Sequence, residues 1–267
     1  MSTKLMTGLT LTALATLGLA SAHPAAAQTL LSNTFTQSTS NNQGSPYNLT
    51  TLGTTDWINY GNYGSNTVNQ KANSQSGIVG AISTATAIGS VFDTHGYDNA
   101  VFAQWSDGST SLGGRASSGG ENADRQNSGA GNGFTFTVNL AGTSTSTVNV
   151  YVAGYSSKSD FQIFAGSATL LDTTAFTTGT NANNEGYFSS TFANTSASSQ
   201  VLKYNFFETA GDGSYENVKL ADVTLASTPT PAAAPEPSQF ASMGFTALAA
   251  MGLILKARKR RLQGEAG

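Results

Sequence analysis

The residues of this 267-residue chain that could do chemistry are mainly carboxylates, because the sequence has no cysteine and only two histidines. A zinc–thiolate site, a cysteine nucleophile and a three-histidine metal site are therefore excluded. Hydrolysis of a glycosidic bond needs two acids about 5 to 10 Å apart, and Asp56, Asp107, Glu208 and Glu216 are the candidates. An acid followed by glycine, such as Asp107-Gly108, is also typical of an ordinary turn. Because no pair stands out, we expect no enzymatic activity.

Two acidic segments that contain glycine are candidates for binding calcium, which takes about six to eight oxygen ligands. The first holds Asp93 and Asp98, and the second holds Glu208 and Asp212. Neither segment has the spacing of an EF-hand or of a glycine-rich calcium repeat. The interpretation that we favour is that these acids are solvated residues in turns. We therefore expect no cofactor and keep calcium as the alternative.

Aromatic side chains offer a different chemistry, in which a ring stacks on the apolar face of a sugar while polar groups bind its hydroxyls. Trp57, Trp105 and Tyr155, with Asp107 as the polar group, are the candidate ligand-binding residues. The alternative is that the two indoles fill a hydrophobic core, where aromatic rings supply much of the buried area. The sequence favours the core for Trp57 and Trp105.

The elements that must position these residues are strands, because the hydrophobic pattern has a period of two. Apolar and polar residues alternate over Phe134–Leu140 and again over Val148–Val152, and the short polar turn between them predicts a hairpin. Further strands are expected at Leu30–Phe35, Thr55–Tyr60, Ile78–Ala87, Ala100–Trp105, Phe161–Phe164, Leu202–Phe207 and Val218–Leu225. Long polar loops are expected at Gly113–Gly133 and Thr177–Gly186. No window predicts an amphipathic helix.

This pattern predicts an all-β fold for residues 28–226, an antiparallel β-sandwich of jelly-roll type. A solenoid is the main alternative, but the sequence has no fixed repeat period. Four segments resemble blocks of exported bacterial β-sandwich domains that are similar to carbohydrate-binding modules: Asp56–Ile58, Trp105–Gly108, Gly131–Phe136 and Val150–Gly154. The resemblance implies a sandwich but no particular ligand or activity.

The charge of the 28–234 segment argues against nucleic acid as a partner. This segment has six basic and 13 acidic residues and thus a net charge of −7. Proteins that bind nucleic acid derive much of their affinity from neutralising phosphates.

Residues 1–27 have the pattern of a secretory signal peptide. Lys4 precedes an apolar stretch, Leu5–Leu19, and the small residues Ala25–Ala27 offer a cleavage site before Gln28. Such a segment is removed after export.

The C-terminal region combines three parts in a fixed order. Residues 227–237 form a proline-rich linker that ends in Pro235-Glu236-Pro237, and residues 238–255 are predicted to form a membrane-spanning helix. The tail, residues 256–267, carries the basic cluster Lys256, Arg258, Lys259, Arg260 and Arg261. The positive-inside rule places this cluster in the cytoplasm and residues 28–234 across the membrane.

This arrangement resembles the PEP-CTERM sorting signal of Gram-negative bacteria. The resemblance implies recognition by an exosortase, cleavage near the Pro-Glu-Pro motif and delivery to the cell surface or the extracellular polysaccharide matrix. We expect an exported protein whose sandwich binds or organises extracellular polysaccharide without catalysis. Its partners would be the secretion machinery, the exosortase, the polysaccharide and, before cleavage, the membrane. The alternatives are a passive structural or adhesive component of the matrix and a glycan-degrading enzyme that uses two carboxylates.

Overall fold

The computed structural model describes the following residues: 28–38, 46–62, 65–71, 82–83, 85–88, 92–93, 101–108, 117–118, 121–123, 130–179, 182–211 and 216–230. The predicted signal peptide, the Pro235-Glu236-Pro237 motif, the predicted membrane helix and the basic tail lie outside these ranges. The one helix in the described ranges, α1 (Leu49–Leu52), has four residues. No helix within these ranges has the length and hydropathy needed to cross a membrane.

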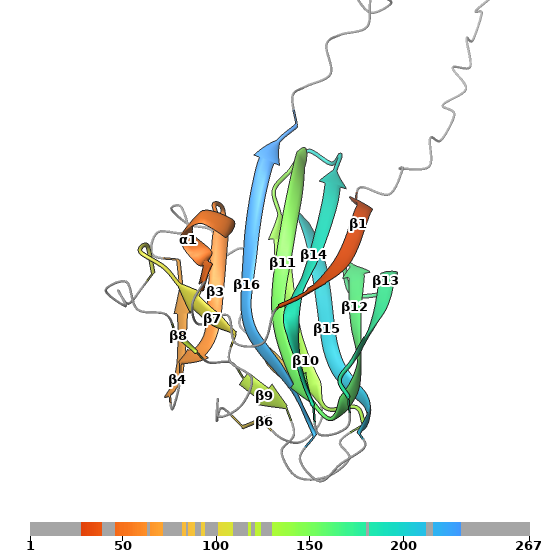
Figure 1. Ribbon diagram of the computed structural model, residues 1–267. Coiled ribbons are helices and arrows are strands. Elements are labelled where there is room, and N and C mark those ends of the chain that lie inside the picture. The colour runs from red at the N-terminus through yellow and green to blue at the C-terminus, as the bar shows by residue number, and fades with distance from the viewer. Residues whose placement is uncertain are drawn as a thin grey trace, which may run out of the picture. The chain divides into compact units, whose positions relative to one another are not determined.

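Most of the described chain forms two antiparallel sheets (Figure 1). The main strands of the eight-stranded sheet are, in spatial order, β1 (Gln28–Gln37), β14 (Asn183–Asn194), β11 (Ser144–Tyr155), β16 (Asn217–Pro229), β3 (Asp56–Asn62) and β4 (Ser65–Gln70). Two short strands, β6 (Phe92–Asp93) and β9 (Glu121–Ala123), extend this sheet beside β16. The five-stranded sheet has the order β13 (Thr169–Thr177), β12 (Ser157–Ala165), β15 (Gln200–Gly211), β10 (Gly133–Leu140) and β5 (Thr86–Ile88). The prediction of an all-β chain with antiparallel sheets is confirmed.

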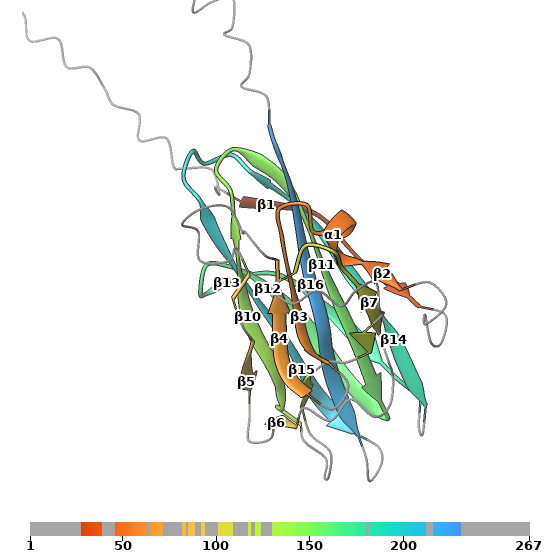
Figure 2. The same ribbon diagram turned by 90° about the vertical axis from the view of Figure 1, so that its left-hand side faces the viewer.

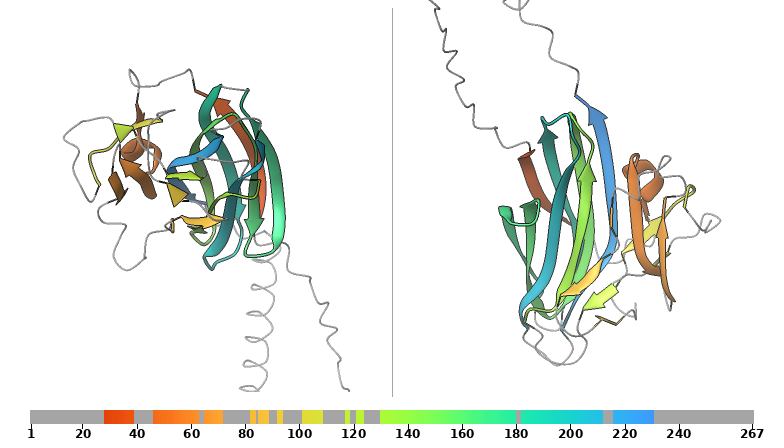
Figure 3. Two further views of the ribbon diagram at one scale, coloured as in Figure 1. Left: turned by 90° about the horizontal axis from the view of Figure 1, so that it is seen from below. Right: turned by 180° about the vertical axis from the view of Figure 1, so that it is seen from behind.

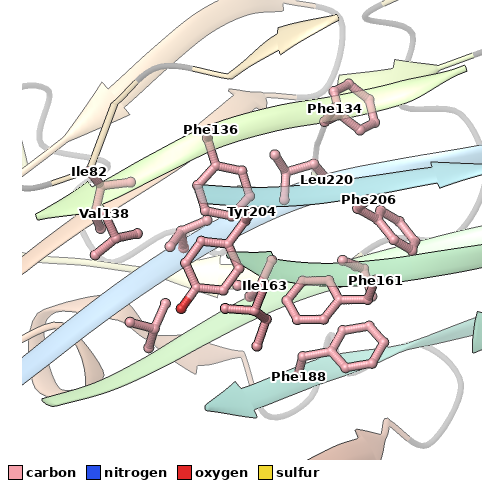
Figure 4. Close-up of a cluster of buried hydrophobic side chains, with 14 of the residues drawn as sticks. Ile82, Phe134, Phe136, Val138, Phe161, Ile163, Phe188, Tyr204, Phe206 and Leu220 are labelled. Atoms are coloured by element: carbon pink, nitrogen blue, oxygen red, sulfur yellow. The ribbon is translucent and has the colours of Figure 1, made fainter. Parts of the chain in front are cut away.

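The two sheets face each other across one hydrophobic core. Successive side chains of a strand point to opposite faces, and alternate residues of β10 (Phe134, Phe136 and Val138) are buried between the sheets. The phenyl rings of Phe161 on β12 and Phe188 on β14 stack across the interface with their centroids 4.0 Å apart (Figure 4). Aromatic side chains from both sheets therefore make up much of the contact.

The predicted hairpin between Phe134–Leu140 and Val148–Val152 is wrong. β10 pairs with β15 and β5, whereas β11 pairs with β14, so the two strands belong to different sheets. The connecting residues 141–143 carry the chain from one sheet to the other, and the Ser144 hydroxyl donates to the Ala141 carbonyl at 2.8 Å. Alternation shows that each strand buries one face, but two such strands can either pair side by side or face each other.

Several predicted boundaries also differ from the structure. The loop expected at Thr177–Gly186 is shorter, because β13 ends at Thr177 and β14 begins at Asn183. Only part of the strand predicted at Ile78–Ala87 lies within the described residues, and there β5 begins at Thr86. β16 continues to Pro229, so the last strand includes the first three residues of the segment expected to be a linker.

A third layer covers part of the outer face of the eight-stranded sheet. It consists of residues 46–55 and 101–108, which we call the cover, and includes α1 and two short parallel strands, β2 (Tyr47–Asn48) and β7 (Phe102–Gln104). β7 also pairs with β8 (Ser117–Ser118). Figure 2 views the molecule from the side of the cover, and both panels of Figure 3 show the cover beside the paired sheets.

Candidate functional site

Three of the predicted ligand-binding residues come together where the cover meets β3. The Trp57 and Trp105 rings lie with their centroids 5.3 Å apart. Asp107 accepts hydrogen bonds at one carboxylate oxygen, from the Trp57 indole Nε1 at 2.9 Å and from the Thr50 hydroxyl at 2.6 Å. Its other oxygen lies 3.2 Å from Lys71 Nζ.

The two tryptophans of this cluster belong to a small hydrophobic core. Trp57 is 0% exposed and Trp105 is 3% exposed, so neither indole presents a face to solvent. A Cβ atom on Gly108 would lie 2.5 Å from the Trp105 ring, which shows how closely the backbone covers it. The core position favoured for both tryptophans agrees with this burial, because the indoles pack against each other and against Leu49 and Ala103, and the sugar-stacking alternative does not fit it.

The carboxylate of Asp107 supports this core from its edge. Partial burial raises the pKa of Asp107, but hydrogen bonds from Thr50, Trp57 and Lys71 and the positive charge of Lys71 outweigh this effect and lower that pKa below its ordinary value. Lys71 also donates to the carbonyl oxygens of Gly53 and Thr54 at 2.8 and 3.0 Å. Asp107 therefore links α1, β3 and the residue that follows β4 through its contacts with Thr50, Trp57 and Lys71.

Tyr155, the remaining candidate for ligand binding, lies away from the tryptophans. It is the last residue of β11 and pairs with Asn183. Asn149 of the same strand donates to Thr224, which lies opposite Trp57. Tyr155 is six residues further along, which corresponds to about 20 Å of extended strand.

Three of the candidate acids, Asp56, Glu208 and Glu216, are buried. Glu208 belongs to β15 and is 0% exposed, and Glu216 is also fully buried just before β16. The Asp56 carboxylate is buried and accepts from the backbone N–H groups of Trp57 at 2.9 Å and Ile82 at 3.1 Å. The interpretation of Glu208 as a solvated loop residue is therefore wrong, because its strand continues past it.

The structure describes only some of the residues that were predicted to bind calcium. Asp98 and Asp212 lie outside the described residues, and Asp93 is described only as part of the β6 backbone. Within the described ranges, no three His, Cys, Asp or Glu side chains gather in a way that could hold a metal ion.

Sequence reasoning missed a buried polar pair beneath the cover. Asp222 on β16 is 0% exposed and lies opposite Asn59 on β3, whose side-chain amide donates to its Oδ1 at 2.7 Å. Asp222 Oδ2 and Asn59 Oδ1 receive no hydrogen bond from any described residue. Burial raises the pKa of Asp222 to about 7, although the Asn59 bond and the charge of Lys219 act in the opposite direction. The only sequence signal is a single acid inside an apolar strand.

Tyrosines surround this pair. Tyr151 of β11 and Tyr187 of β14 lie on the sheet, and Tyr47 of the cover packs against them with centroid distances of 4.6 Å to Tyr151 and 5.7 Å to Tyr187. Burial and the nearby Asp222 charge raise the pKa of Tyr151, and burial is also the main cause of the raised pKa of Tyr47. We call this surface of the eight-stranded sheet the covered face.

The outer face of the five-stranded sheet presents a different polar surface. Because Phe161, Ile163, Tyr204 and Phe206 point into the core, the residues between them on β12 and β15 point outward. Together with the outward side chains of β10 they form the open face: Asp160, Gln162, Phe164, Lys203, Asn205, Phe207, Thr135 and Thr137. Each of these residues is partly exposed.

The register of the sheet places three of these side chains in a row. Gln162 lies opposite Asn205, and Asn205 lies opposite Thr135 on its other side. The phenyl rings of Phe164 and Phe207 belong to the rows on either side, and Lys203 Nζ lies 5.8 Å from the centre of the Phe164 ring. Asn205 Oδ1 is buried at the base of the row and receives no hydrogen bond from the described residues. A ligand with hydroxyl donors and apolar surface would match this arrangement.

Comparison with protein-family models, with curated proteins and with solved structures finds no match to this chain.

Proposed function

We propose that this protein is an exported, non-catalytic β-sandwich that binds or organises extracellular polysaccharide through its open face. The observation that carries the proposal is the Asn205 amide oxygen, which is buried without a donor in a row of amide and hydroxyl groups between two phenyl rings. A buried acceptor without a partner is costly. A sugar hydroxyl would remove this cost, and the neighbouring rings would contact the apolar face of the sugar.

We further propose that the sandwich is a jelly roll. Eight of its strands make up the candidate jelly roll: four of one sheet in the order β3-β16-β11-β14, and four of the other in the order β10-β15-β12-β13. The chain passes from one sheet to the other at nearly every connection, and this crossing supports two interlocked Greek keys rather than a meander.

The sorting proposal is supported by the sequence pattern of the two ends. A chain processed as a PEP-CTERM protein would begin near Gln28 and end near Pro235-Glu236-Pro237. Intact-mass measurement on material from the cell surface should find these termini. A surface protein that still extends to Gly267 would contradict exosortase processing.

Co-sedimentation of the purified full chain with the matrix polysaccharide of the producing organism tests the binding proposal. Saturable binding is expected, and Asn205→Ala should weaken it by about tenfold, the effect of losing roughly 1.4 kcal/mol. Gln37→Ala is the matched control, because it removes an exposed amide on β1 of the other sheet. Absence of binding by the wild type, or equal binding by both variants, would contradict the proposal and favour a passive structural role.

Two further arms of the same experiment separate the alternatives. Loss of binding in the presence of a chelator would indicate a calcium site. Degradation of the polysaccharide that stops after a single acid-to-amide substitution, such as Asp107→Asn, would establish the enzymatic alternative.

A further inference from the structure

A groove of about 510 Å³ opens at one end of the sandwich. It lies where the turn between β12 and β13, the turn between β14 and β15, and the first residue of β1 meet. Its wall includes Gln28, Thr169, Leu171, Ser199, Gln200 and Val201. None of the described residues that line it is ionisable, and the volume is within the range of pockets that hold small ligands.

Among the polar residues of the wall, Gln28 gives the main indication of a ligand site. It is 6% exposed, and its Oε1 is buried without a hydrogen bond from any described residue. Its Nε2 donates to Gln200 Oε1 at 3.5 Å and to the Val201 carbonyl at 3.4 Å, which are long distances for hydrogen bonds. The backbone of Gln28 is fixed by pairing with Asn194. The amide is therefore held at the groove with its acceptor unused.

The rest of the wall indicates the class of ligand. Leu171 and Val201 supply aliphatic surface, and Val201 is 42% exposed although it is apolar. The Thr169 and Ser199 hydroxyls and the Gln200 amide can both donate and accept hydrogen bonds. A pyranose ring has this combination of apolar faces and hydroxyl groups around its edge. In the uncleaved chain, where Gln28 has no free α-amino group, an anionic sugar would lose solvation in this groove without gaining a cationic partner from the described wall.

One residue of the groove wall, Val201, lies in the outward-facing row of β15 that also holds two residues of the open face. Val201 and Lys203 are on β15 and point to the same side, two residues or about 7 Å apart. A chain of sugars that lies along β15 over Asn205 and Lys203 would therefore end beside Val201, at the edge of the groove.

We infer that the groove binds a single neutral pyranose residue at the end of the polysaccharide that the open face binds. This inference rests on the proposed function for the polysaccharide, but the groove can be tested separately with single sugars.

The direct test follows the side-chain amide signals of Gln28 and Gln200 by ¹⁵N NMR. The full chain, in a zwitterionic detergent that contains no sugar, is titrated with the methyl pyranosides of glucose, galactose and mannose, and with that of glucuronic acid as the anionic probe. At least one neutral probe should shift both amide signals saturably, and the anionic probe should not. No shift with any neutral probe, or stronger binding of the glucuronide, would overturn the inference.

A blocking variant links the signals to the groove. Thr169→Trp places an indole at the exposed rim and should lower the affinity for the neutral probe by about tenfold. Thr177→Trp, at the other end of β13 and also exposed, is the matched control and should bind as the wild type does. Equal affinities for the two variants would contradict the assignment to the groove.

The two proposals fail in distinguishable ways. If Thr169→Trp binds the matrix polysaccharide as tightly as the wild type while Asn205→Ala does not, the groove inference fails and the open face remains. If the neutral sugars shift the Gln28 signal but the polysaccharide does not sediment with the protein, the groove remains and the proposed function fails.

Discussion

The outer faces of the two sheets have similar kinds of side chains but different surroundings. The covered face carries Asn59, Tyr151 and Asp222, and the cover buries them beneath Tyr47 and its neighbours. The open face carries amides, hydroxyls and two phenyl rings, and all of them stay partly exposed. Polar and aromatic residues in outward positions of a sheet therefore do not by themselves indicate a ligand site.

Hydrogen bonding separates the two faces further. On the covered face, amide side chains donate to neighbouring side chains, from Asn59 to Asp222 and from Asn149 to Thr224, although Asp222 Oδ2 and Asn59 Oδ1 receive no hydrogen bond from the described residues. On the open face, neighbouring side chains lie in register, but the Asn205 acceptor is left without a donor. The two faces also differ in access, because the cover closes over the acceptors of the first face, whereas the residues around Asn205 stay partly exposed. The first face is therefore suited to stability and the second to binding.

Truncation of an aromatic residue on each face should give the largest difference. Trp57→Ala removes a fully buried indole and the donor to Asp107 and should lower the free energy of unfolding by about 3 to 5 kcal/mol. Phe207→Ala on the open face should cost about 1 kcal/mol, because its ring is already partly in water. Urea unfolding of both variants measures the difference. Similar losses would mean that the open face is also a packed interface.

The second prediction concerns pH and the buried Asp222. The ordinary pKa of 3.8 is raised to about 7 in the folded protein, so the folded state binds this proton more tightly than the unfolded state. Its contribution to stability is complete below pH 3.8 and is lost as the pH rises to about 7. The loss should be about 2 to 4 kcal/mol. When Asp222 Oδ2 is protonated, it can donate a hydrogen bond. In the carboxylate form, that oxygen and Asn59 Oδ1 are both acceptors without a donor among the described residues.

Asp222→Asn isolates this effect, because the amide keeps the shape of the neutral acid. The variant should lack the decrease in stability between pH 4 and pH 7 and should be more stable than the wild type at pH 8. Asp222→Ala should also lack the decrease but should be less stable than Asp222→Asn, since Asn59 then loses its acceptor. Unfolding measured at several pH values compares the three proteins. A decrease that persists in Asp222→Asn would assign it to another group.

Much of the fold could be predicted from alternating hydrophobicity. The strands around Phe134, Phe161 and Val218 were predicted because their inward residues are large and apolar. β14 was missed because its sequence, NNEGYFSSTFAN, contains mainly small and polar residues around two buried phenylalanines. The pairing of strands could not be predicted, since alternation is the same for a hairpin and for two strands that face each other.

The candidate sites were harder to predict for a related reason. Trp57, Trp105 and Asp107 are rare enough in this composition to attract attention, and the structure brings them together, but their burial depends on how the cover folds. The open-face row combines Thr135, Gln162 and Asn205, which are common residue types from three strands. Only the register places them side by side.

A third prediction tests how tightly the cover packs. A Cβ atom at Gly108 would lie 2.5 Å from the Trp105 ring and 2.7 Å from that of Trp57, so Gly108→Ala must displace the cover. We expect a loss of about 1 to 3 kcal/mol in the free energy of unfolding and, because both rings become more exposed, a red shift of tryptophan fluorescence. Unchanged fluorescence and stability would show that the cover can move at little cost.

The smallest effect on stability is expected for an asparagine on the open face, and its counterpart on the covered face is the control. Asn205→Ala removes a buried acceptor that has no donor, so it should change the free energy of unfolding by less than about 0.5 kcal/mol. Asn59→Ala deletes the same group but leaves Asp222 buried without its donor, which should cost about 1 to 3 kcal/mol. Polysaccharide binding should have the opposite order, being weakened by Asn205→Ala and retained by Asn59→Ala under conditions where that variant is folded. If Asn205→Ala were instead the more destabilising variant, its amide would have a structural partner, and the main reason for placing a ligand on the open face would be removed.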